Sequence, residues 1–408
     1  MKIIDGGVTA PKGFKAASTA AGIKYQGRED MAMIYSEKVA TFAGTFTSNV
    51  AKAAPVIWDR NILNTRGTAQ AVVVNSGIAN ACTGKDGLEI CRLTAEHTAK
   101  VLGIDANDVL VSSTGVIGMQ LNIDKLNAGV DALATKLSDS REAAHNAEKA
   151  IMTTDTRPKE MAVEIDIDGV TVTIGAMTKG AGMIHPHMCT MLCYNMTDCD
   201  IDQKLLQKAL SSIVGDTYNM ISVDGDESTN DTCVVLANGM AGNKKITDEN
   251  SAEYKTFFDA LMYVNRELCK KMAGDGEGAT ALFEVVVEQA KNVEEAKTLA
   301  KSVVESSLVK AAIYGHDANW GRIICALGYC GVDFDPEAVD LKFVSKAGEI
   351  QIAKAGVTVD FDEAKATEIL SADEITAVCT MHQGDACATA WGCDLTLDYV
   401  KINADYRS

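Results

Sequence analysis

Threonine hydroxyls are the candidate nucleophiles of this 408-residue chain, and one of them, Thr190, follows Cys189 in a segment rich in glycine and histidine. A threonine hydroxyl is a weak nucleophile unless a base removes its proton, and the threonine's own α-amine can be that base. This amine is free only if the peptide bond before the threonine has been cut. Its pKa of about 8 would then suit proton transfer near neutral pH. The chemistry permits a self-cleaving acyl-transfer enzyme, but by itself it does not select Thr190 from the other threonines.

The residues around Thr190 also suggest a metal site. His185, His187, Cys189 and Cys193 are side chains of the types that zinc accepts. Their spacing fits no standard zinc pattern, so packed thiols beside two loop histidines are the better interpretation. The 12 cysteines include no C-x-x-C pair, which is typical of reduced thiols in a cytoplasmic protein. We therefore expect no metal and no disulfide.

Charged residues next to glycines are candidates for binding a substrate. Lys179 precedes one glycine-rich stretch and could bind a carboxylate, while Glu277 lies in another and could bind an ammonium group. The plainer interpretations are an exposed lysine and a helix that stops at its glycines, with the glutamate in solvent. Asp224 and Asp226 flank a glycine, and for them we favour a turn over a catalytic role.

The element that must position Lys179 is a hairpin. Two alternating apolar runs, 163–167 and 170–174, are joined by Asp168-Gly169, which is typical of a type I′ turn. The second run leads into Lys179 and on towards Thr190. Apolar spacing predicts further strands and helices. The strands are expected over 70–75, 109–111, 233–236 and 283–287, and the helices over 88–102, 123–137, 201–213, 254–272 and 293–309, with a mixture of strands and another helix over 339–400.

Charge and hydropathy exclude several classes of function. The net charge of −18 and the pI of about 4.8 disfavour binding to nucleic acid or to an anionic membrane. The first residues contain no apolar leader, and no stretch approaches the roughly 18 apolar residues of a membrane span. We expect a cytoplasmic protein. An anionic substrate such as glutamate would need a local pocket of cations or backbone N–H groups.

The segment from Lys179 to Leu192 resembles the self-cleavage segment of the ornithine acetyltransferase (glutamate N-acetyltransferase) family. Further segments resemble other blocks of this family and occur in the family's order along nearly the whole chain. Each block is a weak signal by itself, but the whole ordered set is specific. These blocks are 8–14, 74–77, 113–118, 152–156, 222–226, 275–280, 319–322 and 402–408.

The resemblance implies a role for each matching position. Thr190 would attack the carbonyl of Cys189, cut the chain there and afterwards carry the acetyl group. Thr114 through its hydroxyl and Gly115 through its N–H would stabilise the oxyanion of each tetrahedral intermediate. The implied substrate contacts are Thr153, Lys179, Thr190, Glu277, Asn403 and Ser408.

The implied reaction is ping-pong acetyl transfer in arginine biosynthesis, without a metal or an organic cofactor. N-acetylornithine would acetylate Thr190 and leave as ornithine, and glutamate would take the acetyl group to become N-acetylglutamate. The family suggests a tetramer of two cleaved α and two β chains. Whether acetyl-CoA is also a donor stays open, although the negative net charge and the lack of a recognisable phosphate loop disfavour it.

We expect an α/β fold, with a layered αββα-like core and a smaller C-terminal α/β domain. The catalytic core would cover residues 1–280 and the C-terminal domain residues 281–408. Family usage differs at Ala181, His187 and Cys189, where serine, asparagine and alanine are commoner. Cys189 is small enough for the strained turn that cleavage requires.

Two other functions remain open. A self-cleaving threonine amidohydrolase or aminopeptidase would use water in place of glutamate as the acceptor. An uncleaved relative would only bind an amino acid.

Overall fold

The computed structural model describes residues 1–185 and 191–404. The chain forms two compact units, each built from several stretches: 1–180, 190–215 and 227–268 form the first unit, and 181–189, 216–226 and 269–408 form the second. This division does not coincide with the boundary expected at residue 280. Residues far apart in the sequence pack together, so that parts of the expected catalytic core belong to the unit that contains the C-terminal residues.

The first unit is built around one nine-stranded sheet. Its strands are β1 (Lys2–Ile4), β2 (Phe14–Thr19), β3 (Met31–Phe46), β4 (Thr68–Asn75), β5 (Val109–Ser113), β6 (Glu160–Ile167), β7 (Val170–Lys179), β8 (Leu192–Thr197) and β10 (Thr232–Ala237). They follow the order β1-β6-β7-β8-β10-β3-β4-β5, and β2 also pairs with β3. The helices that lie or begin in this unit are α1 (Ala54–Thr65), α2 (Gly84–Leu102), α3 (Ile123–Lys136), α4 (Arg141–Ile151), α5 (Gln203–Asp216) and α6 (Ala252–Ala273), with a short 3₁₀ turn, η1 (Ala106–Asp108).

Strand β3 changes partner along its length and divides the sheet into two limbs. Its first part, 31–36, pairs with β2, and its second part, 41–46, pairs with β10. The register with β4 shifts between Tyr35 and Ala40. One limb therefore contains β2, β4 and β5, and the other contains β10, β8, β7, β6 and β1.

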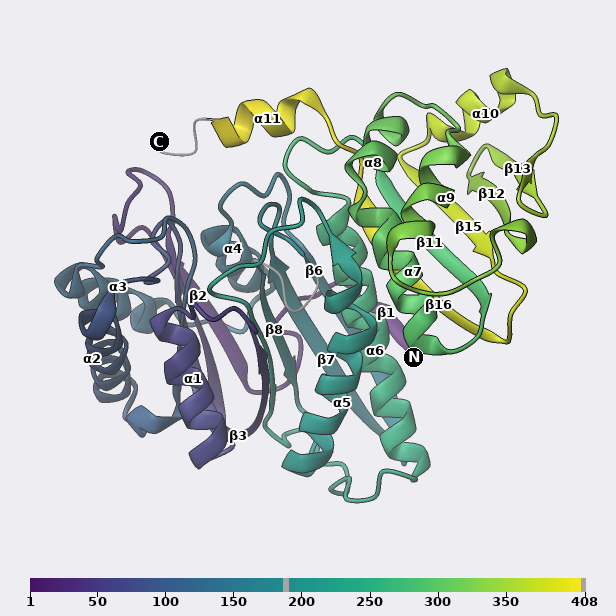
Figure 1. Cartoon of the computed structure of the whole chain (residues 1–408). Coiled ribbons are helices and arrows are strands. Elements are labelled where there is room, and N and C mark those ends of the chain that lie inside the picture. The colour runs from purple at the N-terminus through teal and green to yellow at the C-terminus, as the bar shows by residue number, and fades with distance from the viewer. Residues whose placement is uncertain (186–190, 405–408) are drawn as a thin grey trace. The chain divides into compact units, whose positions relative to one another are not determined.

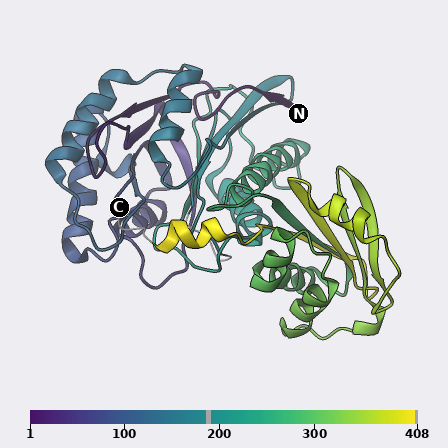
Figure 2. The same cartoon turned by 90° about the horizontal axis from the view of Figure 1, so that it is seen from above.

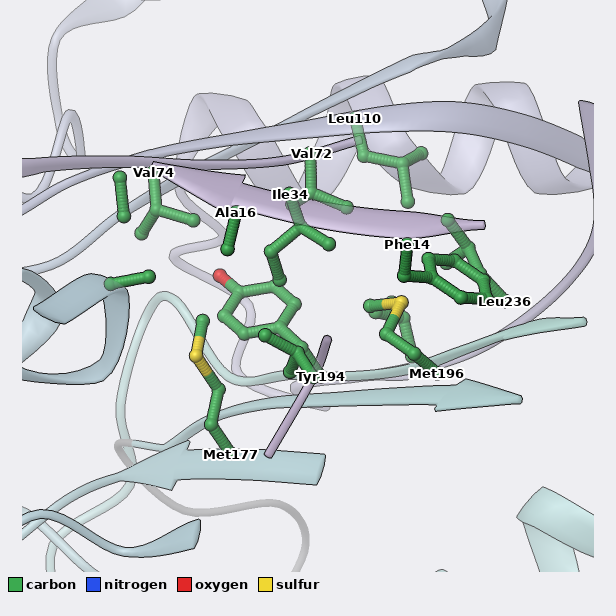
Figure 3. Packing of buried hydrophobic residues seen from close by; sticks show 14 of the residues in the cluster. Phe14, Ala16, Ile34, Val72, Val74, Leu110, Met177, Tyr194, Met196 and Leu236 are labelled. Carbon is green, nitrogen blue, oxygen red and sulfur yellow. The ribbon is translucent and has the colours of Figure 1, made fainter. Parts of the chain in front are cut away.

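The two limbs enclose an apolar interior. Val72 and Val74 of β4 point into it, and Tyr194 and Met196 of β8 point into it from the opposite side (Figure 3). Successive side chains of a strand face opposite ways, so the intervening residues of β4 pack outward against α2 and α3. On the other limb, Asn265 of α6 hydrogen-bonds to the outer face of β8, and α5 runs beside α6 (Figures 1 and 2). The expected αββα layering is confirmed.

The predicted hairpin is also confirmed. Strands β6 and β7 pair antiparallel along 160–167 and 170–177, and both turn residues, Asp168 and Gly169, have positive φ. The second strand continues to Lys179, as the sequence indicated. Helix α4 packs against the sheet through apolar residues that belong to the interior between the two limbs.

The second unit contains a seven-stranded sheet. Its strands are β9 (Ile221–Ser222), β11 (Leu282–Ala290), β12 (Asp340–Ser345), β13 (Gly348–Lys354), β14 (Val357–Thr358), β15 (Glu374–Thr380) and β16 (Ala386–Cys393), in the order β14-β13-β12-β15-β11-β16-β9. The helices wholly in this unit are α7 (Val293–Glu305), α8 (Ser307–Tyr314), α9 (Trp320–Tyr329), α10 (Glu363–Leu370) and α11 (Leu397–Ala404), with the 3₁₀ turns η2 (Tyr218–Met220) and η3 (Pro336–Ala338). Helix α7 packs along β11 and β16.

One predicted helix is wrong in its extent. The sequence predicted a single helix over 293–309, but the structure has two, separated at Ser306. Ser306 adopts an extended conformation and its side chain accepts a hydrogen bond from the Val309 N–H, which caps α8. The apolar spacing continues across this break and therefore did not reveal it. Among the helices that the structure describes, none has the length and apolar character needed to cross a membrane.

Candidate active site

Lys179, at the end of β7, is the centre of a buried polar cluster in the first unit. Its Nζ lies 3.0 Å from Thr153 Oγ1, 3.3 Å from Thr114 Oγ1 and 4.0 Å from Asp155 Oδ2. Lys179 is 2% exposed and Thr114 is 3% exposed, so an exposed lysine at this position is excluded. An ammonium group only donates, so both hydroxyls accept from Lys179 and can give their own hydrogens to another group. The structure thus brings together three of the predicted site residues.

The carboxylate of Asp155 contacts both Lys179 and a second buried lysine, Lys159. Its Oδ1 accepts from Lys159 Nζ at 2.7 Å and from the Gly180 N–H at 2.7 Å, and its Oδ2 accepts from the Thr153 N–H at 3.1 Å. Burial acts to raise the pKa of Asp155, but Lys179 and Lys159 outweigh burial and hold this pKa well below its ordinary range. The carboxylate stays ionised and fixes the position of both lysines.

A second buried carboxyl, that of Glu148, lies beside this cluster. Its Oε1 accepts from the Lys159 N–H at 3.2 Å. Burial, assisted by the charge of Asp155, raises the pKa of Glu148 well above its ordinary value, which favours its neutral form. Two lysines contact the Asp155 carboxylate, and these ammonium groups suit an anionic substrate. The residue pattern predicted no role for Asp155 or Lys159, although Asp155 lies in the family block 152–156.

The loop after β5 carries Thr114 and Gly115. The Thr114 N–H donates to the carbonyl of Asn75 at 3.0 Å, and the Val116 N–H donates to that of Gly77 at 3.1 Å. Gly115 has a φ of +130°, and a Cβ at this position would lie 2.3 Å from the carbonyl carbon of Gly77. No other residue fits there, which explains the glycine beside the threonine.

Glu277 and Asn403 meet in the second unit. Asn403 Nδ2 donates to Glu277 Oε2 at 2.7 Å, and Glu277 is only 6% exposed. The alternative of a solvated glutamate is therefore wrong. A Cβ on Gly182 would lie 2.4 Å from the carboxyl carbon of Glu277, so this glycine allows the chain to pass directly against the carboxylate. The remaining lone pairs of Glu277 can accept from an ammonium group.

Helix α11 is tied to the Glu277 loop, and this tie positions Asn403. Thr396 Oγ1 donates to the carbonyl of Gly278 at 2.8 Å. Gly278 has a φ of +71°, and a Cβ there would lie 2.7 Å from the backbone nitrogen of Tyr399. Burial and nearby carboxylates raise the pKa of the Tyr399 hydroxyl well above its ordinary value, so it remains protonated.

Asp224 forms the turn that the sequence favoured and also holds the segment that leads to the expected cleavage site. Its carboxylate accepts from the N–H groups of Met183 at 2.6 Å, Ile184 at 2.9 Å and Asp226 at 3.2 Å. Burial raises the pKa of Asp224, and these backbone donors oppose that rise. Met183 has a φ of +56°, so the chain turns sharply here.

Several predicted residues lie outside the described residues. They are Cys189 and Thr190 at the expected cut, His187 beside them, and Ser408 at the end of the chain. Two of the four side chains considered as zinc ligands, His185 and Cys193, are described. Each has another polar contact: His185 Nδ1 lies 3.7 Å from Glu305 Oε1, and the buried thiol of Cys193 accepts from Asn195 Nδ2.

A cavity of about 370 Å³ opens beside the Lys179 cluster in the first unit. Its lining residues are Arg28, Glu29, Asn146, Lys149, Met152, Thr153 and Asp155. Arg28 is held by a hydrogen bond to the Met152 carbonyl at 2.6 Å and lies 4.6 Å from the centre of the Tyr25 ring. The cavity therefore contains fixed positive charge next to Thr153.

Comparisons with known proteins agree along the whole chain. The ArgJ family model matches residues 15–408. The chain is 49% identical to the arginine biosynthesis bifunctional protein ArgJ of Caldanaerobacter subterraneus subsp. tengcongensis over 408 residues, which cover 100% of both chains. It is 46% identical to the glutamate N-acetyltransferase of Methanocaldococcus jannaschii over 415 residues, again covering 100% of both. A crystal structure of the ArgJ bifunctional protein of Bacillus halodurans matches with 47% identity and a TM-score of 0.50, covering 52% of this chain and 97% of that one.

Proposed function

The chain belongs to the ArgJ family, and we propose that it is a glutamate N-acetyltransferase of arginine biosynthesis that takes its acetyl group from N-acetylornithine through Thr190. The names of the relatives support the transferase activity and the pathway. The arrangement of polar residues in the first unit supports the assignment of the nucleophile.

The observation that carries this proposal is the register between β7 and β8. Lys179 is paired with Leu192, and Thr190 is two residues before Leu192 along the chain. Only two peptide units, which span at most about 7.6 Å between Cα atoms, separate Thr190 from the residue paired with Lys179, and this supports Thr190 as the nucleophile. The connection between these antiparallel strands is also far longer than the two to five residues usual in a hairpin. Such a connection can be cut without separating the strands.

Self-cleavage would convert the precursor into the active enzyme. The Thr190 hydroxyl attacks the carbonyl carbon of Cys189, the carbon–nitrogen bond breaks, and the released amine takes up the hydroxyl proton. Water then hydrolyses the resulting ester. The products are a carboxylate on Cys189 and a free α-amine and hydroxyl on Thr190.

Turnover uses the same two groups of Thr190. The α-amine accepts the hydroxyl proton while the oxygen attacks the acetyl carbon of N-acetylornithine, and ornithine leaves with a proton on its nitrogen. The amine of glutamate then attacks acetyl-Thr190, releasing N-acetylglutamate and restoring the hydroxyl. Thr114 and Gly115 donate to the oxyanion in both steps. Lys179 and Thr153 suit a substrate carboxylate, and Glu277 with Asn403 suits an ammonium group.

Acetyl-CoA is a second candidate donor. Relatives carry the name bifunctional, and the cavity beside Thr153 offers Arg28 and Lys149 to an anionic ligand. The net charge of −18 opposes the approach of a polyanion, so N-acetylornithine should have the higher specificity constant. Equal constants for the two donors at low salt, with glutamate in excess, would contradict this order.

The proposal includes a cleaved, cytoplasmic enzyme that assembles as two α and two β fragments. The solved Bacillus halodurans chain supports cleavage, because 97% of it corresponds to only 52% of this chain. A cut before Thr190 would leave a C-terminal fragment of comparable extent.

The decisive experiment combines intact mass with an assay of glutamate-dependent ornithine release. The purified protein should consist of fragments 1–189 and 190–408 and should release ornithine only when glutamate is present. Thr190→Ala should remain intact and inactive. Ornithine release without glutamate would indicate an amidohydrolase, and an intact chain that binds but does not turn over would indicate a binding protein.

A further inference from the structure

We infer that Asn230 and Asp231 form a positioning pair that holds the Thr114 loop and Met191, the residue after Thr190, in one fixed arrangement. The inference rests on the proposed function for the roles of Thr114 and Thr190. The contacts themselves all lie in the first unit and involve described residues.

Asn230 holds the loop of Thr114. Its amide nitrogen donates both hydrogens, to the Ser113 carbonyl at 2.8 Å and to the Ala79 carbonyl at 2.6 Å. The amide oxygen accepts from Thr229 Oγ1 at 2.6 Å, which fixes the orientation of the side chain. Ser113 directly precedes Thr114, so Asn230 fixes the peptide unit that carries the proposed oxyanion donor.

Asp231 holds the beginning of the strand that follows Thr190. Its Oδ1 accepts from the Met191 N–H at 3.1 Å, and the Thr232 N–H donates to the Met191 carbonyl at 3.1 Å. Both polar backbone groups of Met191 are therefore bound. Asp231 is 0% exposed, and its Oδ2 is buried without a hydrogen bond to any described residue.

Met191 is the residue that directly follows Thr190 in the chain. The Met191 nitrogen is bonded to the carbonyl carbon of Thr190, and the nitrogen of a preceding residue lies within about 3.7 Å of it in any conformation. The Asp231 carboxyl thus binds the N–H of the peptide bond that links Met191 to the proposed nucleophile. Asn230 and Asp231 are adjacent and directly precede β10, which lies between β8 and β3 in the sheet.

The arrangement explains why both side chains are polar at a buried position. Oxyanion stabilisation depends on donors fixed in advance, and a misplacement of about 1 Å can lower a rate about 100-fold. Asn230 and Asp231, joined by a single peptide unit just before β10, connect the Thr114 loop to Met191. Burial raises the pKa of Asp231 well above its ordinary value, which favours the neutral carboxyl, and asparagine offers the Met191 N–H the same kind of acceptor.

The test compares four variants with the wild-type enzyme. Asp231→Ala and Asn230→Ala each remove one half of the pair, whereas Asp231→Asn keeps the acceptor for the Met191 N–H. Asp198→Ala is the matched control, since Asp198 is a buried carboxyl that accepts from the N–H groups of Thr173 and Lys12 at the other end of β8. The measurements are the rate of self-cleavage by mass, kcat, KM and Tm.

We expect Asp231→Ala and Asn230→Ala to lower the cleavage rate and kcat by about 10- to 100-fold, with KM changed much less. Asp231→Asn should restore both rates to near wild-type values. Asp198→Ala should lower Tm without a matching fall in kcat. A loss of Tm alone in the alanine variants would show that the pair is merely structural and would overturn the inference.

Measurements on the wild-type enzyme distinguish a failure of the proposed function from a failure of the inference about Asn230 and Asp231. If it cleaves before Thr190 but lacks glutamate N-acetyltransferase activity, the proposed function fails, while the cleavage rates of the variants still test the pair. If Asp231→Ala does not fold, Asn230→Ala and Asp231→Asn supply the same comparison. Normal cleavage and normal kcat in Asn230→Ala would then overturn the inference.

Discussion

Lys179 determines what Thr114 can do. A threonine hydroxyl can donate or accept, and in isolation its orientation is not fixed. Here the hydroxyl oxygen is 3.3 Å from a buried ammonium group that has no lone pair to offer. The hydroxyl must therefore accept from Lys179 and direct its hydrogen elsewhere. This gives the donor that the oxyanion assignment requires before any substrate binds.

Replacement of Thr114 tests this role of the hydroxyl. Thr114→Ala should lower kcat by about 100-fold with a smaller effect on KM, because the lost donor faces charge that exists mainly in the intermediate. Thr114→Ser keeps the hydroxyl and should retain most of the activity. If Thr114→Ala raises only KM, then Thr114 binds substrate and the oxyanion assignment is wrong.

At the scale of elements, β5 is held in place by a carboxyl from α1. Asp59 is fully buried, and its Oδ1 accepts from the Val111 N–H at 2.9 Å. Burial raises the pKa of Asp59 well above its ordinary value, and the Val111 donor offsets only part of this. The folded protein keeps this proton at pH values where the unfolded chain, with a pKa of about 4, has lost it. This contribution to stability is therefore complete below pH 4 and is lost as the pH rises towards the folded pKa.

Asp59→Asn should remove this pH dependence. Asparagine keeps an acceptor for the Val111 N–H but does not ionise. The Tm of the variant relative to wild type should therefore rise between pH 5 and pH 8. Any pH-independent change in Tm that the amide causes does not affect this trend. Asp333→Asn, at an exposed position, is the control and should show no such trend. A difference in Tm that does not change with pH would contradict the buried-carboxyl argument.

Helix α11 provides a second test at this scale, because it presents Asn403 to Glu277. Asn403→Ala removes a hydrogen bond of 2.7 Å from a buried carboxylate while the helix stays tied through Thr396. We expect KM for the amino-acid substrates to rise by about 10-fold, which corresponds to about 1.4 kcal/mol, with Tm nearly unchanged. Lys401→Ala, on an exposed part of the same helix, is the control. An equal loss in both variants would mean that α11 acts as a whole and that Asn403 has no specific role.

At the scale of the molecule, a cut before Thr190 would leave two fragments that share one sheet. Strand β7 precedes the cut and pairs with β8, which follows it, along 174–179 and 192–197. Strand β3 likewise pairs with β10 of the second fragment along 41–46 and 232–237. The apolar interior between the limbs contains residues of both fragments. Cleavage therefore need not release either fragment.

The cleaved protein should behave as one particle until it unfolds. Denaturing gels should show two bands, whereas size exclusion in buffer or in 1 M salt should show a single species. Salt weakens exposed ion pairs but leaves sheet hydrogen bonds and apolar burial in place. Urea should separate the fragments in the same transition that exposes the buried tyrosines. Separation of the fragments in high salt alone would contradict this picture.

Local patterns in the sequence predicted the hairpin, about half of the described helices and the family blocks, because each depends on residues close together in the chain. The 16-residue strand β3 was missed, since its polar centre, Ser36-Glu37-Lys38, interrupts the alternation where the strand changes partner. Helix α4 was missed as well, because alanines form most of its buried face. The break at Ser306 was hidden by apolar spacing that runs through it.

The sequence by itself determined the family and, with it, the expected nucleophile, oxyanion donors and substrate contacts. Only the tertiary structure decided that Lys179, Thr114, Thr153 and Asp155 form one buried cluster, in which two lysines lower the pKa of Asp155, and that burial raises the pKa values of Glu148 and Asp231. These pKa values depend on burial and on charges contributed by separate strands and loops. Residue types and spacing define which groups are available. Their distances and protonation are set by long-range packing, which no local pattern encodes.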